Sequence, residues 1–440
     1  MTTASDSEIL TRVGPGTPMG SMFREYWIPA TMSSELKADG DPLRLMLLGE
    51  KLIAFRDNKG RVGIMDHRCP HRCASLFFGR NEKGGLACAY HGWKFDTEGN
   101  CLEQPNVPPH QAFPQKVKAK AYPTAERYGL VWVYMGARKE LPPLPCFEAV
   151  MLPDDERNLF MVQRECNYLQ ALEGDIDTSH LGFLHQGSVT IDQVDQTNNG
   201  RYALINRAPE YHVADTEWGT MYTAHRPADA GNTYMRFAHF MFPFWTLPPD
   251  GNFCDHVVAR AWVPMDDTHT MFTHLSWKKT TPGLRTMKDG SPIPGMSMAQ
   301  KFLPNTTDWH GRWRLAMNAS NDYGLDREAQ RNNVIYCGID GLHLQDQAIT
   351  ESMGGIVDHD FEQLAISDFM VTRTRRRLVQ AARAFAESGI APPGVDNPEV
   401  FGGARSGDFV SPNSIGWLQA YADEMRRAQN PTGALRIAAE

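Results

Sequence analysis

The chain lacks the features that mark membrane proteins, exported proteins and small disulfide-bonded proteins. Its 440 residues contain no run of eighteen apolar side chains, so the sequence predicts no transmembrane helix. The first residues, MTTASDSEILTRVG, have no apolar segment behind a basic one, which argues against a signal peptide. The eight cysteines are too dispersed for a disulfide framework. We therefore expect a cytoplasmic protein with reduced cysteines and no membrane contact.

The chain also lacks an excess of basic charge, internal repeats and low-complexity tracts. With 44 basic and 52 acidic residues its net charge is −8, which argues against nucleic acid as the main partner. Hydrophobic residues make up 42% of the chain and charged residues 22%, an ordinary balance for a globular enzyme. Because 440 residues exceed the usual size of one domain, we expect two domains.

The first part of the chain has the pattern of a small all-β domain. Short apolar or alternating segments at 43–49, 51–57, 61–67 and 128–136 are typical of strands, and turn residues separate the first three. The proline-rich segment LPPLPCF (141–147) is typical of a linker. We predict one domain at 1–145 and a second at 146–440.

The second part combines strands and helices, so the predicted fold class is α+β. Segments between 211 and 277 predict a broad antiparallel sheet. Helices are predicted at 163–185 and at about 343–353, 360–387 and 414–428. Residues 280–332 are polar and rich in turns, and so long an irregular segment is typical of a lid or an assembly arm.

A first group of metal-ligating residue types lies in CPHRCASLFFGRNEKGGLACAYH (69–91). Cys69 and His71 form one arm, and Cys88 and His91 form the other. A structural zinc ion and a Rieske iron–sulfur cluster both use two Cys and two His. Each arm here mixes Cys with His, whereas zinc fingers usually put like residues on one arm. The mixed arms therefore favour a [2Fe-2S] cluster, with zinc as the alternative.

A second group lies in NYLQALEGDIDTSHLGFLH (167–185). On a regular helix Glu173, Asp177 and His180 share one face, but His185 lies about 140° from His180. Gly182 between the two histidines would permit a local break that brings the rings together. The alternative is an amphipathic helix with an acidic face and two incidental histidines.

A third ligand would have to come from another part of the chain. Two His and one carboxylate on one face of an iron ion leave positions open for O₂, as an oxygenase requires. The segment GLHLQDQAITESMGG (341–355) carries two candidates on a predicted helix. The family resemblance described below implies that Asp346 binds the metal and that Glu351 has a supporting or structural role, although a solvated helix face would also explain Glu351.

These motifs resemble one enzyme family. CPH followed by CAYHGWKF is similar to the Rieske domain of aromatic-ring-hydroxylating oxygenases. Cys73 has no partner on the second arm, where Ala89 and Tyr90 stand, so the site resembles the oxygenase type and not the disulfide-clamped respiratory type. Further segments extend the resemblance to the α subunits of the phthalate-dioxygenase-like branch, which includes aryl O-demethylases: TPMGSMFREYWIPA, NYLQALEGDIDTSH, NDYGLDREAQ and QDQAITESMGG.

The resemblance implies a fold, two cofactors and an assembly. It implies a helix-grip catalytic domain with a large antiparallel sheet, a Rieske [2Fe-2S] cluster, and mononuclear Fe(II) on His180, His185 and Asp346. It implies a homotrimer that takes electrons from an NADH-dependent flavin and iron–sulfur reductase or a ferredoxin. Asp177 would then bridge His180 to the neighbouring subunit's cluster ligand His91. Asn167, Gln170 and Glu173 match polar positions of the family motif, although helix capping or packing would also explain Asn167 and Gln170.

The sequence says least about the substrate. An aromatic acid is the leading hypothesis, with ring dioxygenation and O-demethylation of a methoxylated aryl acid as possible reactions. The strand segment at 234–246 offers aromatic surface with Arg236 and His239, and Arg207 is a further cation that could bind a carboxylate. A core or solvated position would explain each of these residues equally well. Two other functions remain open: an electron-transfer protein without the mononuclear site, and a zinc-stapled binding module.

Overall fold

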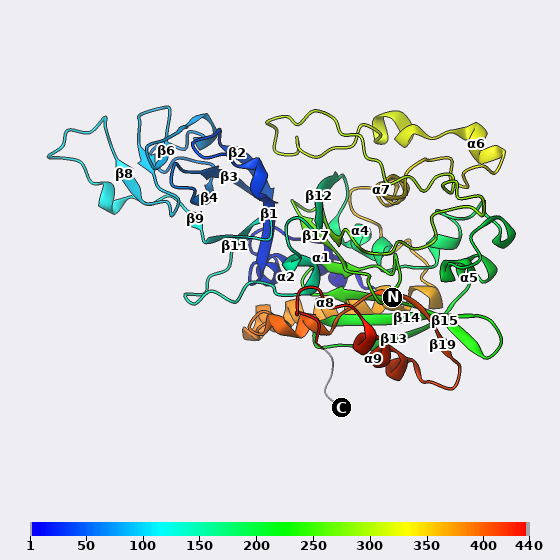
Figure 1. Cartoon of the computed structure of the whole chain (residues 1–440). Coiled ribbons are helices and arrows are strands. Elements are labelled where there is room, and N and C mark those ends of the chain that lie inside the picture. The colour runs from blue at the N-terminus through cyan, green and yellow to red at the C-terminus, as the bar shows by residue number, and fades with distance from the viewer. Residues whose placement is uncertain (1, 437–440) are drawn as a thin grey trace.

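The computed structural model describes residues 2–436 and contains two regions of β-structure (Figure 1). Small sheets in blue and cyan form one end of the molecule, and a large sheet with the later helices forms the rest. This arrangement agrees with the predicted α+β class. No helix within the described residues is both long and apolar enough to cross a bilayer.

The small-sheet region contains two four-stranded antiparallel sheets. One has the order β2 (Leu43–Leu47), β3 (Glu50–Arg56), β4 (Val62–Asp66) and β9 (Ala121–Tyr122). The other runs β5 (Arg80–Glu82), β6 (Gly85–Ala87), β7 (Lys94–Phe95) and β8 (Cys101–Glu103). The β2–β3 turn has positive φ at Leu48 and Gly49, which matches the tight turn that suits twisted hairpins. The three strands predicted between 43 and 67 are thus confirmed.

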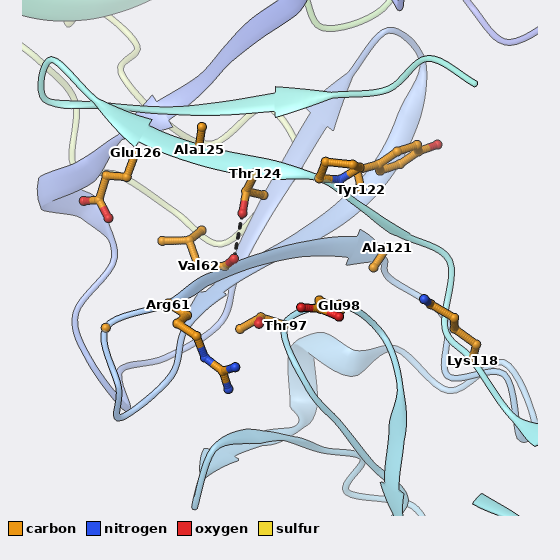
Figure 2. A pocket seen from close by; sticks show the side chains of 12 residues that line it. Arg61, Val62, Thr97, Glu98, Lys118, Ala121, Tyr122, Thr124, Ala125 and Glu126 are labelled. Atoms are coloured by element: carbon orange, nitrogen blue, oxygen red, sulfur yellow. Dashed lines mark hydrogen bonds between the residues drawn. The ribbon is translucent and has the colours of Figure 1, made fainter. Parts of the chain in front are cut away.

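A groove of about 610 Å³ opens on this region between β4, the turn at 97–98 and the segment from β9 to β10 (Thr124–Arg127) (Figure 2). Its wall is tied by a hydrogen bond of 2.8 Å that the Thr124 hydroxyl donates to the Val62 carbonyl. None of the predicted metal ligands lines it.

A three-stranded sheet joins the two regions: β1 (Trp27–Met32), β11 (Leu130–Tyr134) and β10 (Thr124–Arg127). Its buried side chains share one core with the large sheet. The N-terminal helices α1 (Ala4–Thr11) and α2 (Pro18–Phe23) also belong to that core, because Phe23 packs edge-on against Tyr168 and Phe244 at centroid distances of 5.2 and 5.5 Å. The start of the chain therefore packs against the large sheet as well as against strands β2 and β3 of the small-sheet region.

The large sheet is antiparallel and has eight strands. Its order is β12 (Arg157–Arg164), β18 (Thr270–Trp277), β17 (Val258–Pro264), β16 (Trp245–Leu247), β15 (Asn232–Met241), β14 (Gly219–Pro227) and β13 (Glu210–Asp215), with β19 (Gly407–Pro412) beside β15. The broad sheet predicted at 211–277 is confirmed, and β12 and β19 extend it at strands that the sequence analysis did not predict.

The helix predicted at 163–185 is wrong at both ends. Residues up to Arg164 belong to β12, which pairs with β18 along its whole length. Helix α4 spans only Tyr168–Asp175, and Asn167 caps it by accepting a hydrogen bond from the Leu169 N–H. A separate 3₁₀ turn follows at His180–Gly182. The later helices are α7 (Leu342–Ser352), α8 (Phe369–Ser388) and α9 (Trp417–Arg427), so residues 360–368 do not continue α8 as predicted.

The irregular segment at 280–332 connects the two regions within one chain. Arg312 forms an ion pair of 2.5 Å with Glu35, and the Trp313 indole N–H donates to the same carboxylate at 3.0 Å. Arg44 reaches back to the carbonyl of Thr307 at 2.7 Å. Through these contacts the segment acts as a strap, which means that it holds the two regions of the same chain together. The sequence predicted a lid or an assembly arm and did not predict this strap role.

Replacing Arg312 with Met should destabilise the protein by about 3–5 kcal/mol, because it leaves the Glu35 carboxylate buried without its cation. The free energy of unfolding from urea titration checks this. Arg80→Met is the matched control, since the Arg80–Glu82 pair is exposed and should contribute at most about 1 kcal/mol. Equal losses in the two variants would contradict the strap role.

Candidate metal centres

The two Cys-His arms form loops with the same backbone pattern. The Cys69 N–H donates to the carbonyl of Ala74, and the Cys69 carbonyl accepts from Cys73. In the second loop the Cys88 N–H donates to Trp93, and the Cys88 carbonyl accepts from Gly92. Cys73 and Gly92 hold equivalent positions, and both have positive φ. Cys73 is exposed, whereas Cys69 and Cys88 are buried.

The side chains of these loops converge on one place. Cys69 and Cys88 are buried, and the rings of His71 and His91 lie 4.6 Å apart. Trp93 stacks on His71 at 4.3 Å and fixes that ring. The Nδ1 atom of His91 is buried and has no hydrogen-bond partner among the described residues, so a bound metal would satisfy it. The donor set of two thiols and two imidazoles fits a Rieske cluster.

The spread of these four residues argues against a single zinc ion. Tetrahedral zinc holds its ligand atoms close to one another. Among residues 2–436, only two groups of three or more potential ligands place those atoms within 4.8 Å of one another, and the Cys-His loops form neither. One such group is Asp266, His269 and His310, in which both imidazoles already hydrogen-bond to Asp266.

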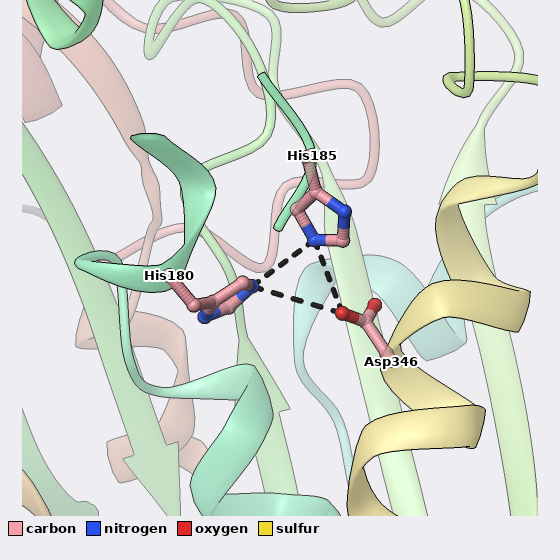
Figure 3. A group of neighbouring side chains, drawn as sticks. All are labelled: His180, His185 and Asp346. Atoms are coloured by element: carbon pink, nitrogen blue, oxygen red, sulfur yellow. Dashed lines mark hydrogen bonds and ion pairs between the residues drawn. The ribbon is translucent and has the colours of Figure 1, made fainter. Parts of the chain in front are cut away.

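The other group is His180, His185 and Asp346 (Figure 3). The Nε2 atoms of the two histidines lie 3.1 Å apart. Oδ1 of Asp346 lies 3.0 Å from Nε2 of His185 and 3.7 Å from Nε2 of His180. The 3₁₀ turn that begins at His180 provides the break needed to bring both rings together. This triangle of two imidazoles and one carboxylate on one side is typical of non-heme ferrous sites.

Gln345 and Asp177 contact the Nδ1 atoms of the two imidazoles and so leave the Nε2 atoms to face the triangle. The amide nitrogen of Gln345 donates to the carbonyls of Gly295 and Ile339, so its Oε1 must accept from Nδ1–H of His185, 2.6 Å away. Asp177 stands 3.3 Å from Nδ1 of His180 in the same way. Both Nε2 atoms then keep their lone pairs for a metal. Gln345 was not among the site residues predicted from the sequence.

The electrostatic potential at this site favours a bound cation. Burial alone would lower the pKa of His180, but Asp177 and then Asp346 outweigh it and raise that pKa to about 9. Burial opposes ionisation of Asp346 too, yet the two histidines hold its pKa below the usual value. A divalent ion would be stabilised by the same surplus of negative charge.

Three other predicted residues have structural contacts. Glu173 forms a buried ion pair with Arg375, at 2.5 Å from Nε. The Asn167 amide donates to the carbonyls of Thr11 and Asp267, in addition to capping α4. Glu351 accepts from the Glu165 N–H and from the Tyr323 hydroxyl. These residues position α4 and α7, which carry the ligands or lead to them.

The proposed substrate residues separate in the structure. Arg207 lies against the ligand segment, with its guanidinium 5.4 Å from the Phe183 ring and 3.2 Å from the Gly187 carbonyl. Arg236 is buried beside the Tyr234 hydroxyl. His239 is three residues further along β15 and so faces the opposite side of the sheet, where Trp218 and the Arg405 carbonyl occupy both ring nitrogens. We therefore withdraw His239 as a substrate contact.

A cavity of about 120 Å³ lies beside the triangle. Apolar side chains of α4, β17 and α7 form much of its wall, and Asp177, His180 and Asp346 line it as well. Arg207, Arg236 and His239 do not line it. An apolar cavity that meets a few convergent polar groups is the usual form of a small-molecule site.

Replacing Gln345 with Met should weaken binding of the mononuclear metal by about 10- to 100-fold, because His185 loses the acceptor that fixes its tautomer. Iron analysis after desalting should fall from about three toward two atoms per chain, with the visible spectrum of the cluster unchanged. Gln347→Met is the control, because the Gln347 amide donates to Glu351 on the same helix. Unchanged iron content in Gln345→Met would contradict the assigned role.

Comparisons with known proteins agree with both centres. The family model "Rieske [2Fe-2S] domain" matches residues 26–120, and "LigXa C-terminal domain like" matches residues 133–432. The chain is 50% identical over 428 residues to the oxygenase subunit of 3-chlorobenzoate-3,4-dioxygenase from Comamonas testosteroni, covering 96% of this chain and 98% of that one. It is 36% identical over 399 residues to the phthalate 4,5-dioxygenase oxygenase subunit of Pseudomonas putida, with 88% and 87% coverage.

Two further matches complete the comparison. The oxygenase subunit of 5,5'-dehydrodivanillate O-demethylase from a Sphingobium strain is 31% identical over 393 residues, with 86% of this chain and 80% of that one covered. The structure of dicamba monooxygenase bound to 3,6-dichlorosalicylic acid matches with a TM-score of 0.55 at 17% identity, covering 83% and 99% of the two chains, which shows a shared fold. The electron-transfer and zinc-module alternatives are thereby set aside. The chain belongs to the family of Rieske non-heme iron oxygenases, as an oxygenase subunit.

Proposed function

We propose that this oxygenase acts on an aromatic carboxylic acid and adds oxygen to its ring. The observation that carries the proposal is the cavity of ring size beside the His180, His185 and Asp346 triangle. The relatives with 50% and 36% identity are described as acting on 3-chlorobenzoate and on phthalate, and both compounds are aryl carboxylates. O-demethylation of a methoxylated aryl acid is the second candidate, because one relative is an O-demethylase subunit.

Each centre has a separate task. When bound, the cluster supplies single electrons and the ferrous ion supplies the centre that activates O₂. Cys69, Cys88, His71 and His91 would hold the cluster, and the triangle of Figure 3 would hold the iron. Gln345 and Asp177 orient the imidazoles from behind. The apolar wall of the cavity keeps water away from the substrate ring.

We further propose a homotrimer in which Asp177 connects two subunits. The small-sheet region and α7 lie in separate parts of one chain (Figure 1). Asp177 is half-buried at the cavity, near the exposed side chains of Ile349 and Met353. The connector after α7 adds Phe361 and Ile366, with 85% and 90% of their surfaces exposed. Such apolar exposure supports docking of a neighbouring subunit's cluster loop here.

The electron donor is a reductase or ferredoxin of a multicomponent system, and we propose an NADH-dependent flavin and iron–sulfur reductase. All eight cysteines are free, which supports a reducing, cytoplasmic setting. Arg207, beside the ligand segment, and Arg236, on the sheet, stay proposed contacts for a part of the substrate outside the cavity.

Replacing Asp177 with Asn should keep both metal centres and nearly abolish product formation, because the amide cannot serve as the charged bridge between His180 and the partner's His91. Iron content and the cluster spectrum report the metals, and product yield with a reductase reports electron delivery. The control is Asp192→Asn, whose carboxylate lies in an exposed turn. Full turnover by a folded Asp177→Asn protein would overturn the bridge.

Product analysis decides the reaction. The protein is supplied with a matching reductase, NADH, O₂ and a panel of benzoates, phthalates and methoxybenzoates. We expect cis-diols from the unsubstituted or halogenated acids. Formaldehyde release from the methoxylated acids, without diols from the others, would establish the second candidate. Absence of any product from the whole panel would contradict an aromatic acid as substrate.

A further inference from the structure

One buried arginine in the cavity beside the triangle has no partner. Arg164 ends strand β12, lines the cavity, and is 1% exposed. Its Nε and Nη1 atoms are buried and have no hydrogen-bond partner within the described part of the chain. An unpaired buried cation is costly, so a protein that keeps one usually has an anion to place against it.

The other charged groups around Arg164 already have ion-pair or hydrogen-bond partners. Asp346 and Glu351 are the carboxylates whose charges act on it most strongly. Asp346 faces the two imidazoles, and Glu351 accepts hydrogen bonds from Glu165 and Tyr323. The second arginine of the cavity, Arg260, is bound by Asp175 and, at 2.7 Å, by Asp250. Arg164 is therefore the cavity's cation that is left for a ligand.

Aromatic rings hold Arg164 in place without using its N–H groups. The guanidinium carbon lies 5.7 Å from the Trp262 ring and 5.5 Å from the Phe272 ring. Those two rings pack on each other at 4.7 Å. Cation–π contacts of this kind orient a guanidinium and leave its edge free for a carboxylate.

The size of the cavity limits the ligand. An engineered apolar cavity of about 150 Å³ accepts benzene. A cavity of about 120 Å³ with an open side is close to that size and can take one aromatic ring. A carboxylate on that ring would meet the N–H edge of Arg164, and the ring itself would lie beside His180 and Asp346.

We infer that Arg164 binds the carboxylate of a single-ring aromatic acid and so determines the specificity of the enzyme. This inference rests on the proposed function and adds to it the residue that selects an acid over a neutral compound. Arg164 takes this role because it, and neither Arg207 nor Arg236, lines the cavity at the metal ligands.

The test measures binding separately from turnover. Benzoate and its neutral analogue benzamide are titrated by calorimetry into the iron-loaded, oxidised wild type and into Arg164→Met, Arg164→Lys and the control Arg80→Met. Arg164→Met should weaken benzoate binding by about 10- to 100-fold and change benzamide binding by less than about threefold. Arg164→Lys should recover part of the benzoate affinity, and Arg80→Met, whose exposed arginine does not line the cavity, should retain it.

Stability and iron content show whether a variant is intact. In the absence of ligand, Arg164→Met should unfold at the same temperature as the wild type or higher, because an unpaired buried charge is removed. Benzoate should raise the melting temperature of the wild type and not of Arg164→Met. Iron should stay at about three atoms per chain in both.

Any one of three results with Arg164→Met would overturn this inference and leave the proposed function intact. The first is full affinity for benzoate, and the second is an equal loss of affinity for benzoate and benzamide. The third is loss of the mononuclear iron, which would make Arg164 a positioning residue for Asp346. If instead the wild type neither binds nor oxidises any aryl carboxylate, the proposed function fails and this inference falls with it.

Discussion

The structure depends on holding two imidazole nitrogens and one carboxylate oxygen within 3.0 to 3.7 Å of one another. Such a triangle is unfavourable without a cation, because lone pairs and negative charge face each other. The protein maintains this triangle by binding the Nδ1 atoms on the far side of the two rings: Gln345 binds that of His185, and Asp177 binds that of His180. Gln345 is in turn fixed by two backbone carbonyls, so the metal geometry is set by backbone positions.

The packing of α4 on α7 transmits this constraint to the rest of the fold. The Gln170 amide on α4 donates to the carbonyls of Thr350 and Gly354 at the end of α7, at 2.8 Å each. Glu173 ties α4 to α8 through Arg375, which also pairs with Glu362 in the connector. The large sheet supplies the floor against which both helices are packed. Residues far from the metal thus determine the positions of its ligands.

Much of the candidate site could be predicted from the sequence because the ligands lie in short, chemically distinctive segments. Cys69, His71, Cys88 and His91 stand on two arms of a single loop pair, and His180 and His185 are five residues apart. Asp346 was predicted from a distant segment with the help of the family resemblance. The antiparallel sheet was predictable for a similar reason, since its strands are long and separated by clear turns.

The failures have physical causes too. Only residues 165–167 separate the strand Arg157–Arg164 from helix α4, so the predicted helix began two residues inside the strand. His239 was assigned with Arg236 although strand alternation puts residues three apart on opposite faces. Arg164 went unnoticed because an arginine at a strand end is usually solvated, and only tertiary structure shows that this one is buried without a partner.

A single-turnover reaction shows whether this protein transfers oxygen from O₂ to an aryl carboxylate, and it needs no electron donor. Protein whose cluster and iron have been chemically reduced is mixed with an aryl carboxylate and isotopically labelled O₂, and the aromatic product is examined by mass spectrometry. We predict a product that contains oxygen from labelled O₂, formed by the wild type and not by an Asp346→Asn variant that retains its cluster. Unlabelled product, or no product from a fully iron-loaded wild type, would show that the protein is not an oxygenase of aryl carboxylates.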